Sequence, residues 1–330
     1  MISVPDRSSL LLEAFVLPPA QALGKWKSWR ETLDPNSLDT VYFGILPMLS
    51  HRLEAWLTGD PARQSILGIC KRVWTQNQLA FRSLVAIAAS LREARVQRIA
   101  VSGPAAWALL YAEREAIRPI DSLELLVPRR EAAAAVQASA RCGWRLLPEY
   151  PNPEGATLDL LEGVWLRNAR DERLKLGWRL LPSPPELAES REKLGALTSI
   201  EIQGVRLSMP APEEMLLHAL AGRRESYQVD WRWDALALLD LRRVDWTRLD
   251  QLLAGEITAR RRLRELRQQW RVPVPGRILK QETGWFQRRL HAVWRDYQWH
   301  AWQAGTPASW AGFAAYCPKR WWKVFVTDRA

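Results

Sequence analysis

The spacing of apolar residues predicts helices for roughly the first 90 residues. Apolar side chains recur every three or four positions in the segment LDTVYFGILPMLSHRLEAWL, and again from Ile66 through Leu91. This spacing places them on one face of a helix. Gly59 and Pro61 lie between the two segments and separate them. We therefore expect a helical N-terminal region, residues 1–92.

After about residue 92, the spacing of apolar residues predicts short strands that alternate with helices. The segment VQRIAVSG predicts a short strand, PAAWALLYA a helix that Pro104 opens in its first turn, and SLELLVP a second strand. A helix is expected from Arg129 to about Cys142, and Gly143 fits a left-handed C-cap there.

Further strands are expected beyond that helix. The segments WRLLPEY, TLDLLEGVWLRN and ERLKLGWRLL show alternation and are separated by Pro, Asn and Gly. IEIQGVRLSM predicts either a strand with a bulge at Gly204 or a hairpin with a two-residue turn at Gln203 and Gly204. Together these segments predict a small mixed sheet, with one or two helices across one face, over residues 93–210.

A second helical region is expected over residues 211–330. APEEMLLHALAG has Pro212 and two glutamates in its first turn and Gly222 at its end, which are helix start and stop signals. WRWDALALLDLRR and RLDQLLAGEITARRRLREL continue it, and a further apolar stripe runs from Phe286 to Ala301. The expected fold class is α+β, a mixed sheet flanked by two helical regions.

Composition narrows the class of protein. The chain has 330 residues, of which 48% are hydrophobic, so it can bury a substantial core. No apolar run approaches the roughly 18 residues that span a bilayer, and the first residues lack a signal-peptide pattern, so we expect a cytoplasmic protein. The three cysteines and four histidines are dispersed, which argues against a disulfide framework and a zinc site.

Positive charge is concentrated toward the C-terminus. The net charge is +11, and residues 256–330 hold fifteen Lys and Arg against five Asp and Glu, a balance of +10. Eight of the nineteen tryptophans lie in the same segment. This distribution favours an acidic partner, either nucleic acid, an anionic membrane surface or an acidic protein. The tryptophans fit base stacking or an interface, but they fit ordinary helix packing equally well.

Six segments in order carry a family resemblance. They are FGILPMLSHRL, IAVSGPAAWALLY, IRPIDSLELLVP, RLKLGWRL, MPAPEEMLLHALAG and WRWDALALLDLRRVDWTRL, and they span most of residues 10–255. They resemble the bacterial family known as the uncharacterised nucleotidyltransferases, of the DNA polymerase beta type. The resemblance implies that type of fold, with Mg²⁺ and a nucleoside triphosphate as cofactor and substrate. Some members are found beside genes for peptide natural products or exopolysaccharides.

The positions that correspond to the catalytic acids of the family differ in this chain. The family motif DID falls on Ser122 and Glu124, and the third acid, from VDLHW, falls on Lys175, with Gly177 in place of the histidine. Magnesium takes hard oxygen ligands, mainly carboxylates and phosphates, and a permanent cation repels it. Two of the three expected carboxylates are replaced, which predicts that two-metal chemistry is lost.

The remaining polar residues of these motifs leave alternatives open. Asp121 could replace a lost ligand only if a bulge turned it toward the face of Ser122 and Glu124, because neighbouring strand residues point to opposite faces. Ser102 and Gly103 precede a helix, where amides could approach a phosphate or simply form a turn. Arg118 matches an Arg-Pro pair of the family and is either structural or directed at the substrate.

Three functional hypotheses follow. In the first, the chain is a catalytically degenerate nucleotidyltransferase that serves as a binding or accessory factor with a nucleotide, peptide or protein partner, needs no cofactor, and pairs Glu124 with Lys175 where the ions once lay. In the second, it is an active transferase that moves a nucleotidyl group from a triphosphate to a hydroxyl, with Glu124 and Asp121 as Mg²⁺ ligands. In the third, residues 256–330 bind nucleic acid or an anionic surface.

Overall fold

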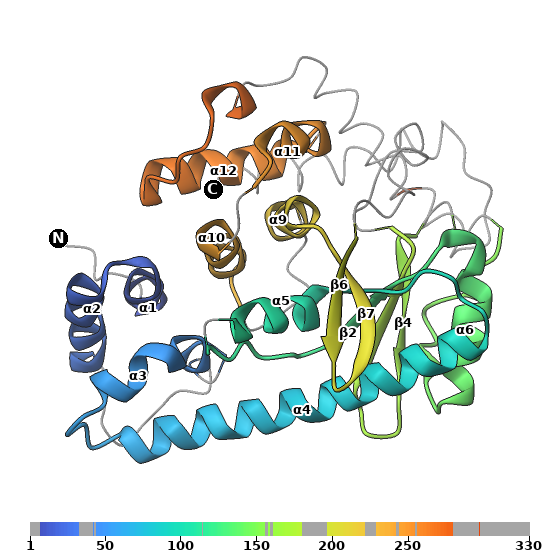
Figure 1. The fold of residues 1–330 in the computed structure, drawn as a ribbon, viewed down its shortest axis with the longest axis horizontal. Coiled ribbons are helices and arrows are strands. Elements are labelled where there is room, and N and C mark those ends of the chain that lie inside the picture. Colours follow the sequence, from blue (N-terminus) through green and yellow to red (C-terminus); the bar gives the residue numbers. More distant parts are fainter. Residues whose placement is uncertain are drawn as a thin grey trace.

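Helices surround a mixed sheet in the computed structural model of the protein (Figure 1). The structure describes residues 7–32, 42, 44–113, 115–155, 158, 161–179, 197–221, 229–241, 244–254, 256–279 and 297. Its N-terminal region is helical, as the apolar spacing predicts. The helices are α1 (Arg7–Val16), α2 (Pro19–Glu31), α3 (Ser50–Trp56) and the long α4 (Arg63–Glu93), with a short 3-10 helix, η2 (Leu46–Leu49), before α3.

Tryptophans fill the space between the N-terminal helices. The indole rings of Trp26 and Trp29 are almost fully buried, with their centroids 4.9 Å apart. The ring of Trp56 lies 5.6 Å from that of Trp26, and the ring of Tyr42 meets Trp29 edge to face. Buried aromatic pairs of this kind add to the stabilisation that area burial gives. In this region, tryptophan is therefore a packing residue.

The sheet contains seven described strands in the order β3-β4-β5-β2-β1-β7-β6. Strand β1 pairs antiparallel with β2 and parallel with β7, and β2 pairs parallel with β5. The remaining neighbours are antiparallel. The strands are β1 (Ala100–Ser102), β2 (Leu123–Leu126), β3 (Arg145–Leu146), β4 (Gly163–Arg167), β5 (Arg173–Gly177), β6 (Leu197–Ile202) and β7 (Val205–Pro210). The predicted α+β class and mixed sheet are confirmed.

A two-residue turn joins β6 to β7. Gln203 and Gly204 both have positive φ, 48° and 78°, and the strands pair on each side of them from Ile202 and Val205 outward. A type I′ turn requires positive φ at both of its central residues. Of the two expectations for this segment, the hairpin turn is therefore correct and the bulge is wrong.

Helices α4 and α6 cover one face of the sheet, and α5 adjoins its centre. Helix α5 (Gly103–Ala112) contacts β1 and β2, whereas α6 (Ala132–Arg141) contacts α4, β3 and β5. A 3-10 turn, η3 (Arg129–Glu131), precedes α6, and Gly143 follows it with the predicted left-handed φ of 82°. On β5, Leu174 and Leu176 are buried toward α6, so Arg173 and Lys175 lie on the opposite face.

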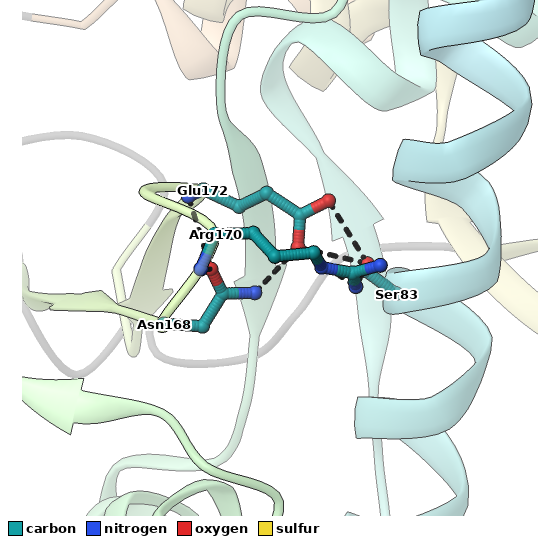
Figure 2. Close-up of polar contacts among 4 residues, drawn as sticks. All are labelled: Ser83, Asn168, Arg170 and Glu172. Carbon is teal, nitrogen blue, oxygen red and sulfur yellow. Dashed lines mark hydrogen bonds and ion pairs between the residues drawn. The ribbon is translucent and has the colours of Figure 1, made fainter.

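The turn between β4 and β5 is fastened to α4. Figure 2 shows Ser83 of α4 meeting the side chains of the turn. Its hydroxyl donates to both carboxylate oxygens of Glu172, at 3.1 and 3.0 Å, and accepts from Arg170 at 2.9 Å. The Asn168 amide also donates to Glu172, and its carbonyl oxygen accepts two backbone N–H groups of the turn. These bonds fix the hairpin on the α4 side of the sheet.

The C-terminal helices form a separate layer, above the sheet in Figure 1. They are α9 (Pro212–Ala221), α10 (Trp231–Leu241), α11 (Trp246–Leu252) and α12 (Ile257–Trp270), followed by a 3-10 helix, η4 (Gly276–Leu279). Helix α9 contacts β7 and each of the other three α-helices. The stripe expected from Phe286 onward lies outside the described residues, apart from Tyr297. Within the described part of the chain, no helix is long and apolar enough to cross a membrane.

A buried ion pair joins this helical layer to the entrance of β2. Arg118 Nε and Nη2 donate to the two carboxylate oxygens of Asp234 on α10, both at 2.8 Å, and the two residues are 2% and 5% exposed. The side chain of Asn77 on α4 bonds the backbone on both sides of Pro119, through Arg118 O and Ile120 N. The segment before β2 is thus held by α4 and α10 together.

A variant that lacks this ion pair should unfold at a much lower urea concentration than the wild-type protein. Asp234→Asn would leave the Arg118 guanidinium buried without its counter-charge, which lowers the free energy of unfolding by about 3–5 kcal/mol. Asp171→Asn is the control, because the pair of Asp171 with Arg167 is largely exposed and such pairs contribute below about 1 kcal/mol. Urea unfolding followed by circular dichroism measures both variants. Equal shifts would contradict a structural role for the buried pair.

The described cysteines differ in reactivity. Cys70 of α4 is buried, and burial raises the pKa of its thiol to about 11, whereas Cys142 is exposed. A raised pKa keeps the thiol protonated, and only the thiolate is nucleophilic. In a Cys317→Ser variant at mildly alkaline pH, iodoacetamide should therefore alkylate Cys142 and leave Cys70 intact in the native protein. Peptide mass mapping measures both sites, and equally fast alkylation of Cys70 would contradict its burial.

Candidate functional site

Three of the predicted site residues lie side by side in the sheet. Ser102 at the end of β1 pairs with Glu124 of β2, and Glu124 pairs with Lys175 of β5. Residues that are paired in register project from the same face of a sheet. Ser102, Glu124 and Lys175 therefore form one row across the three central strands.

The Glu124 carboxylate lies against Gly103 at the first turn of α5. A methyl group placed on Gly103 would lie 2.3 Å from Glu124 Cδ and 2.6 Å from each carboxylate oxygen. Gly103 also has φ of 58°, which side chains other than glycine rarely adopt. Glu124 is 9% exposed. Glycine at this position makes room for a negative charge at the positive end of the α5 dipole.

Lys175 takes a different partner from the one that the sequence predicts. Its Nζ lies 3.6 Å from Glu162 Oε1 and 5.8 Å from the centre of the Trp165 ring, and its side chain is 14% exposed. Among the described residues, no Glu124–Lys175 ion pair is formed, although the two are direct neighbours. The Glu124 carboxylate turns toward Gly103, and the Lys175 ammonium turns toward β4 instead.

Asp121 lies just before strand β2, next to Ser122. Its Oδ1 accepts a hydrogen bond from Ser122 Oγ at 3.3 Å. Although burial lowers the pKa of the Arg118 guanidinium, Asp234 raises it above its ordinary value, and Asp121 adds to that rise. Asp121 therefore acts electrostatically on the buried Arg118–Asp234 pair.

The two other predicted binding residues are enclosed by the protein. Arg118 donates to Asp234 and to the backbone oxygen of Pro119, so these contacts make it part of the packing. Ser102 is 3% exposed, and it precedes α5 without a side-chain bond to the helix. Pro104 stands in the first turn of α5 and removes one backbone donor there.

Sequence reasoning missed four residues that shape the site, namely Asn77, Glu162, Trp165 and Asp234. Pairing of β4 with β5 across the turn at 168–172 would have placed Trp165 opposite Lys175. Glu162 directly precedes β4 in the same hairpin, where its reach to Lys175 depends on the side-chain direction. The contacts of Asn77 and Asp234 join segments far apart in the chain, and no local spacing indicates them.

The residues present do not fit the magnesium pair that the fold family implies. Magnesium requires near-octahedral oxygen ligands, whereas this row offers one carboxylate, one hydroxyl and one ammonium group. Within the described residues, no group of three or more His, Cys, Asp or Glu side chains could hold a metal ion.

The order of β1, α5 and β2 around this row agrees with the nucleotidyltransferase type of fold that the sequence motifs imply. A family model described as "Uncharacterised nucleotidyltransferase" matches residues 42–267. The chain therefore belongs to the uncharacterised nucleotidyltransferase family. The central row and the buried Arg118–Asp234 pair both lie within the matched region.

The chain is similar to an antigenic nucleotidyltransferase-like protein from Paracoccidioides brasiliensis, at 14% identity and a TM-score of 0.35, over 58% of this chain and 93% of that one. No curated protein matches the chain.

The contact between Gly103 and Glu124 predicts a specific loss of stability. Gly103→Ala adds a methyl group that meets the carboxylate and also strains the backbone. Gly59→Ala is the control, because Gly59 has φ of 76° but nothing within 4 Å of the added methyl group. Gly59→Ala should lower the free energy of unfolding by about 1 kcal/mol, and Gly103→Ala by clearly more.

A double-mutant cycle assigns the excess to Glu124. Adding Glu124→Ala to the Gly103→Ala variant removes the carboxylate that the methyl group would meet, so the excess loss should disappear. Thermal unfolding followed by circular dichroism measures all four proteins of the cycle. Additive effects of the two substitutions would show that the contact is not tight.

Proposed function

We propose that this nucleotidyltransferase-family protein no longer carries out metal-dependent nucleotidyl transfer and serves as a binding or accessory factor. The observation that carries this proposal is the row of Ser102, Glu124 and Lys175, in which the ammonium of Lys175 occupies a position where the family has a metal-binding acid. The resemblance further implies a bacterial protein that belongs to a biosynthetic gene cluster, such as that of a peptide natural product.

The charge of Lys175 opposes a bound metal. Two unit charges 4 Å apart interact by about 4 kcal/mol at an effective dielectric constant of about 20, and a divalent ion doubles this figure. The side chain is held in place by Glu162 and by the ring of Trp165. Glu162 directly precedes β4 and Trp165 lies on it. The Lys175 side chain therefore cannot move away from a bound metal ion without breaking both contacts.

The position of Glu124 opposes a bound triphosphate. The first turn of a helix attracts anions through its free N–H groups and its dipole. Here the carboxylate of Glu124 already lies against Gly103 in that turn. A phosphate that approached α5 would meet a negative charge, and Pro104 leaves one donor fewer to bind it.

Titration calorimetry with nucleotides tests the proposal. Wild-type protein should bind ATP, GTP, CTP and UTP no more tightly with Mg²⁺ than without it, because no set of carboxylates recruits the ion. A Ser122→Asp, Glu124→Asp, Lys175→Asp variant restores the acids of the family motif and should gain magnesium-dependent binding. Lys71→Asp is the control for charge, since Lys71 lies exposed on α4.

Two results would overturn the proposal. The first is magnesium-dependent consumption of a nucleoside triphosphate by the wild-type protein that Glu124→Ala abolishes. It would establish the active transferase, with Glu124 and Asp121 as the residues to examine next. The second is equal magnesium-dependent binding by the restored variant and the Lys71→Asp control.

A further inference from the structure

A row of arginines crosses the sheet face that carries Lys175. Arg145 of β3 pairs with Arg167 of β4, and Arg167 pairs with Arg173 of β5. Paired residues share a face, so the three side chains project together. Like charges directly opposite each other on neighbouring strands destabilise a sheet. The sheet contains two such pairs of like charges, Arg145 with Arg167 and Arg167 with Arg173.

Few acids offset the three charges. Arg167 pairs with Asp171, and this pair is largely exposed, with side chains 49% and 79% accessible. Within the part of the chain that the structure describes, no carboxylate pairs with Arg145 or Arg173. The guanidinium of Arg173 lies 4.5 Å from the centre of the Trp165 ring, and its Nε is buried without a hydrogen-bond partner. Arg145 and Arg167 are exposed and Arg173 is half-buried, so the row offers guanidinium donors to an external anion even though the Nε of Arg173 is enclosed.

The β4–β5 hairpin, which carries Arg167 and Arg173, is bonded to α4 on the face opposite these arginines. The turn between β4 and β5 is bonded to Ser83 on the α4 side (Figure 2), while Arg167 and Arg173 point to the other side. These bonds hold the backbone that carries Arg167 and Arg173, so less backbone entropy is lost when the two side chains bind a ligand.

We propose that this row binds the phosphodiester backbone of single-stranded nucleic acid. Neighbouring strands lie about 4.8 Å apart, so the three arginines span about 10 Å. One phosphate cannot bridge that span, whereas a chain of phosphates contacts each arginine in turn. The guanidinium fork matches a phosphate bidentately.

The surroundings of the row favour nucleic acid over a membrane. The exposed large apolar side chains of the described residues are Trp74 and Leu79, both on α4. The arginine row therefore lacks neighbouring apolar groups that would enter a bilayer. Trp165 is 7% exposed beneath Arg173, so bases cannot stack on it, and binding is independent of sequence.

The row also leads to the central site. Glu124 pairs with Lys175 and Leu123 with Leu174, so continuing this register one residue back places Ser122 beside Arg173. A strand bound across β3, β4 and β5 would therefore reach the degenerate site from one side. The proposal stands whether or not that site is active, because none of its three arginines belongs to the substituted positions.

Salt-dependent binding of a fluorescein-labelled oligodeoxythymidine tests the proposal, with the full chain and fluorescence anisotropy as the measurement. For single strands, the slope of log affinity against log salt is about 0.7 per neutralised phosphate. The Arg145→Gln, Arg167→Gln, Arg173→Gln variant should therefore lose about 2 from that slope and bind at least tenfold more weakly at low salt. Replacing the same arginines by lysine should preserve the slope.

A matched variant separates a local effect from one of net charge. Arg63, Arg72 and Arg82 lie exposed on α4, which packs on the other side of the sheet. Replacing these three by glutamine removes the same charge and should leave the slope within the error of wild type. Circular dichroism checks the folding of each variant. If the triple variant unfolds, Arg145→Gln with Arg167→Gln keeps the Arg173 contact with Trp165 and should lose about two thirds of the effect.

Three outcomes would overturn the proposal. The wild-type protein could fail to bind the oligonucleotide at low salt. The α4 control could lose as much slope as the row variant, which would assign binding to net charge. Finally, phosphatidylserine vesicles or polyglutamate could bind in a way that depends on the three arginines while the oligonucleotide does not, which would assign the row to a membrane or an acidic protein.

Discussion

The buried pair of Arg118 and Asp234 is the interaction on which the arrangement of this protein depends. Each charge is excluded from water and needs the other, because an isolated ion in such a place costs several kcal/mol. The pair draws α10 against the segment that enters β2. Strand β2 lies between β1 and β5, so the position at which the chain enters β2 sets its register and thereby the residues that lie beside Glu124. The composition of the central row thus follows from a contact made outside it.

Most of the fold can be predicted from local sequence patterns. Apolar periodicity identifies the long helix α4, and alternation with glycine punctuation identifies the strands up to β7. The left-handed conformation at Gly143 follows from glycine, the residue type that adopts it most readily. The sequence could not decide between a bulge and a turn at Gly204. The turn requires a positive φ at Gln203 as well, and the pairing of the strands on both sides imposes that φ.

The site was predictable in its members but not in its contacts. The family motif identifies Ser122, Glu124 and Lys175 and even their common face. The direction of each side chain depends on partners from elsewhere: Gly103 accommodates Glu124, and Glu162 attracts Lys175. Those partners lie on other strands or beyond strand ends, and the sequence carries no spacing that connects them.

The tight packing of Glu124 on Gly103 makes the residue types allowed at the two positions depend on each other. A sequence with alanine or a larger residue in place of Gly103 has no room for the carboxylate, so it requires a shorter side chain in place of Glu124. In this chain a shorter residue must replace Glu124 before Gly103 can be enlarged. The permitted order of substitutions is therefore set by a single missing methyl group.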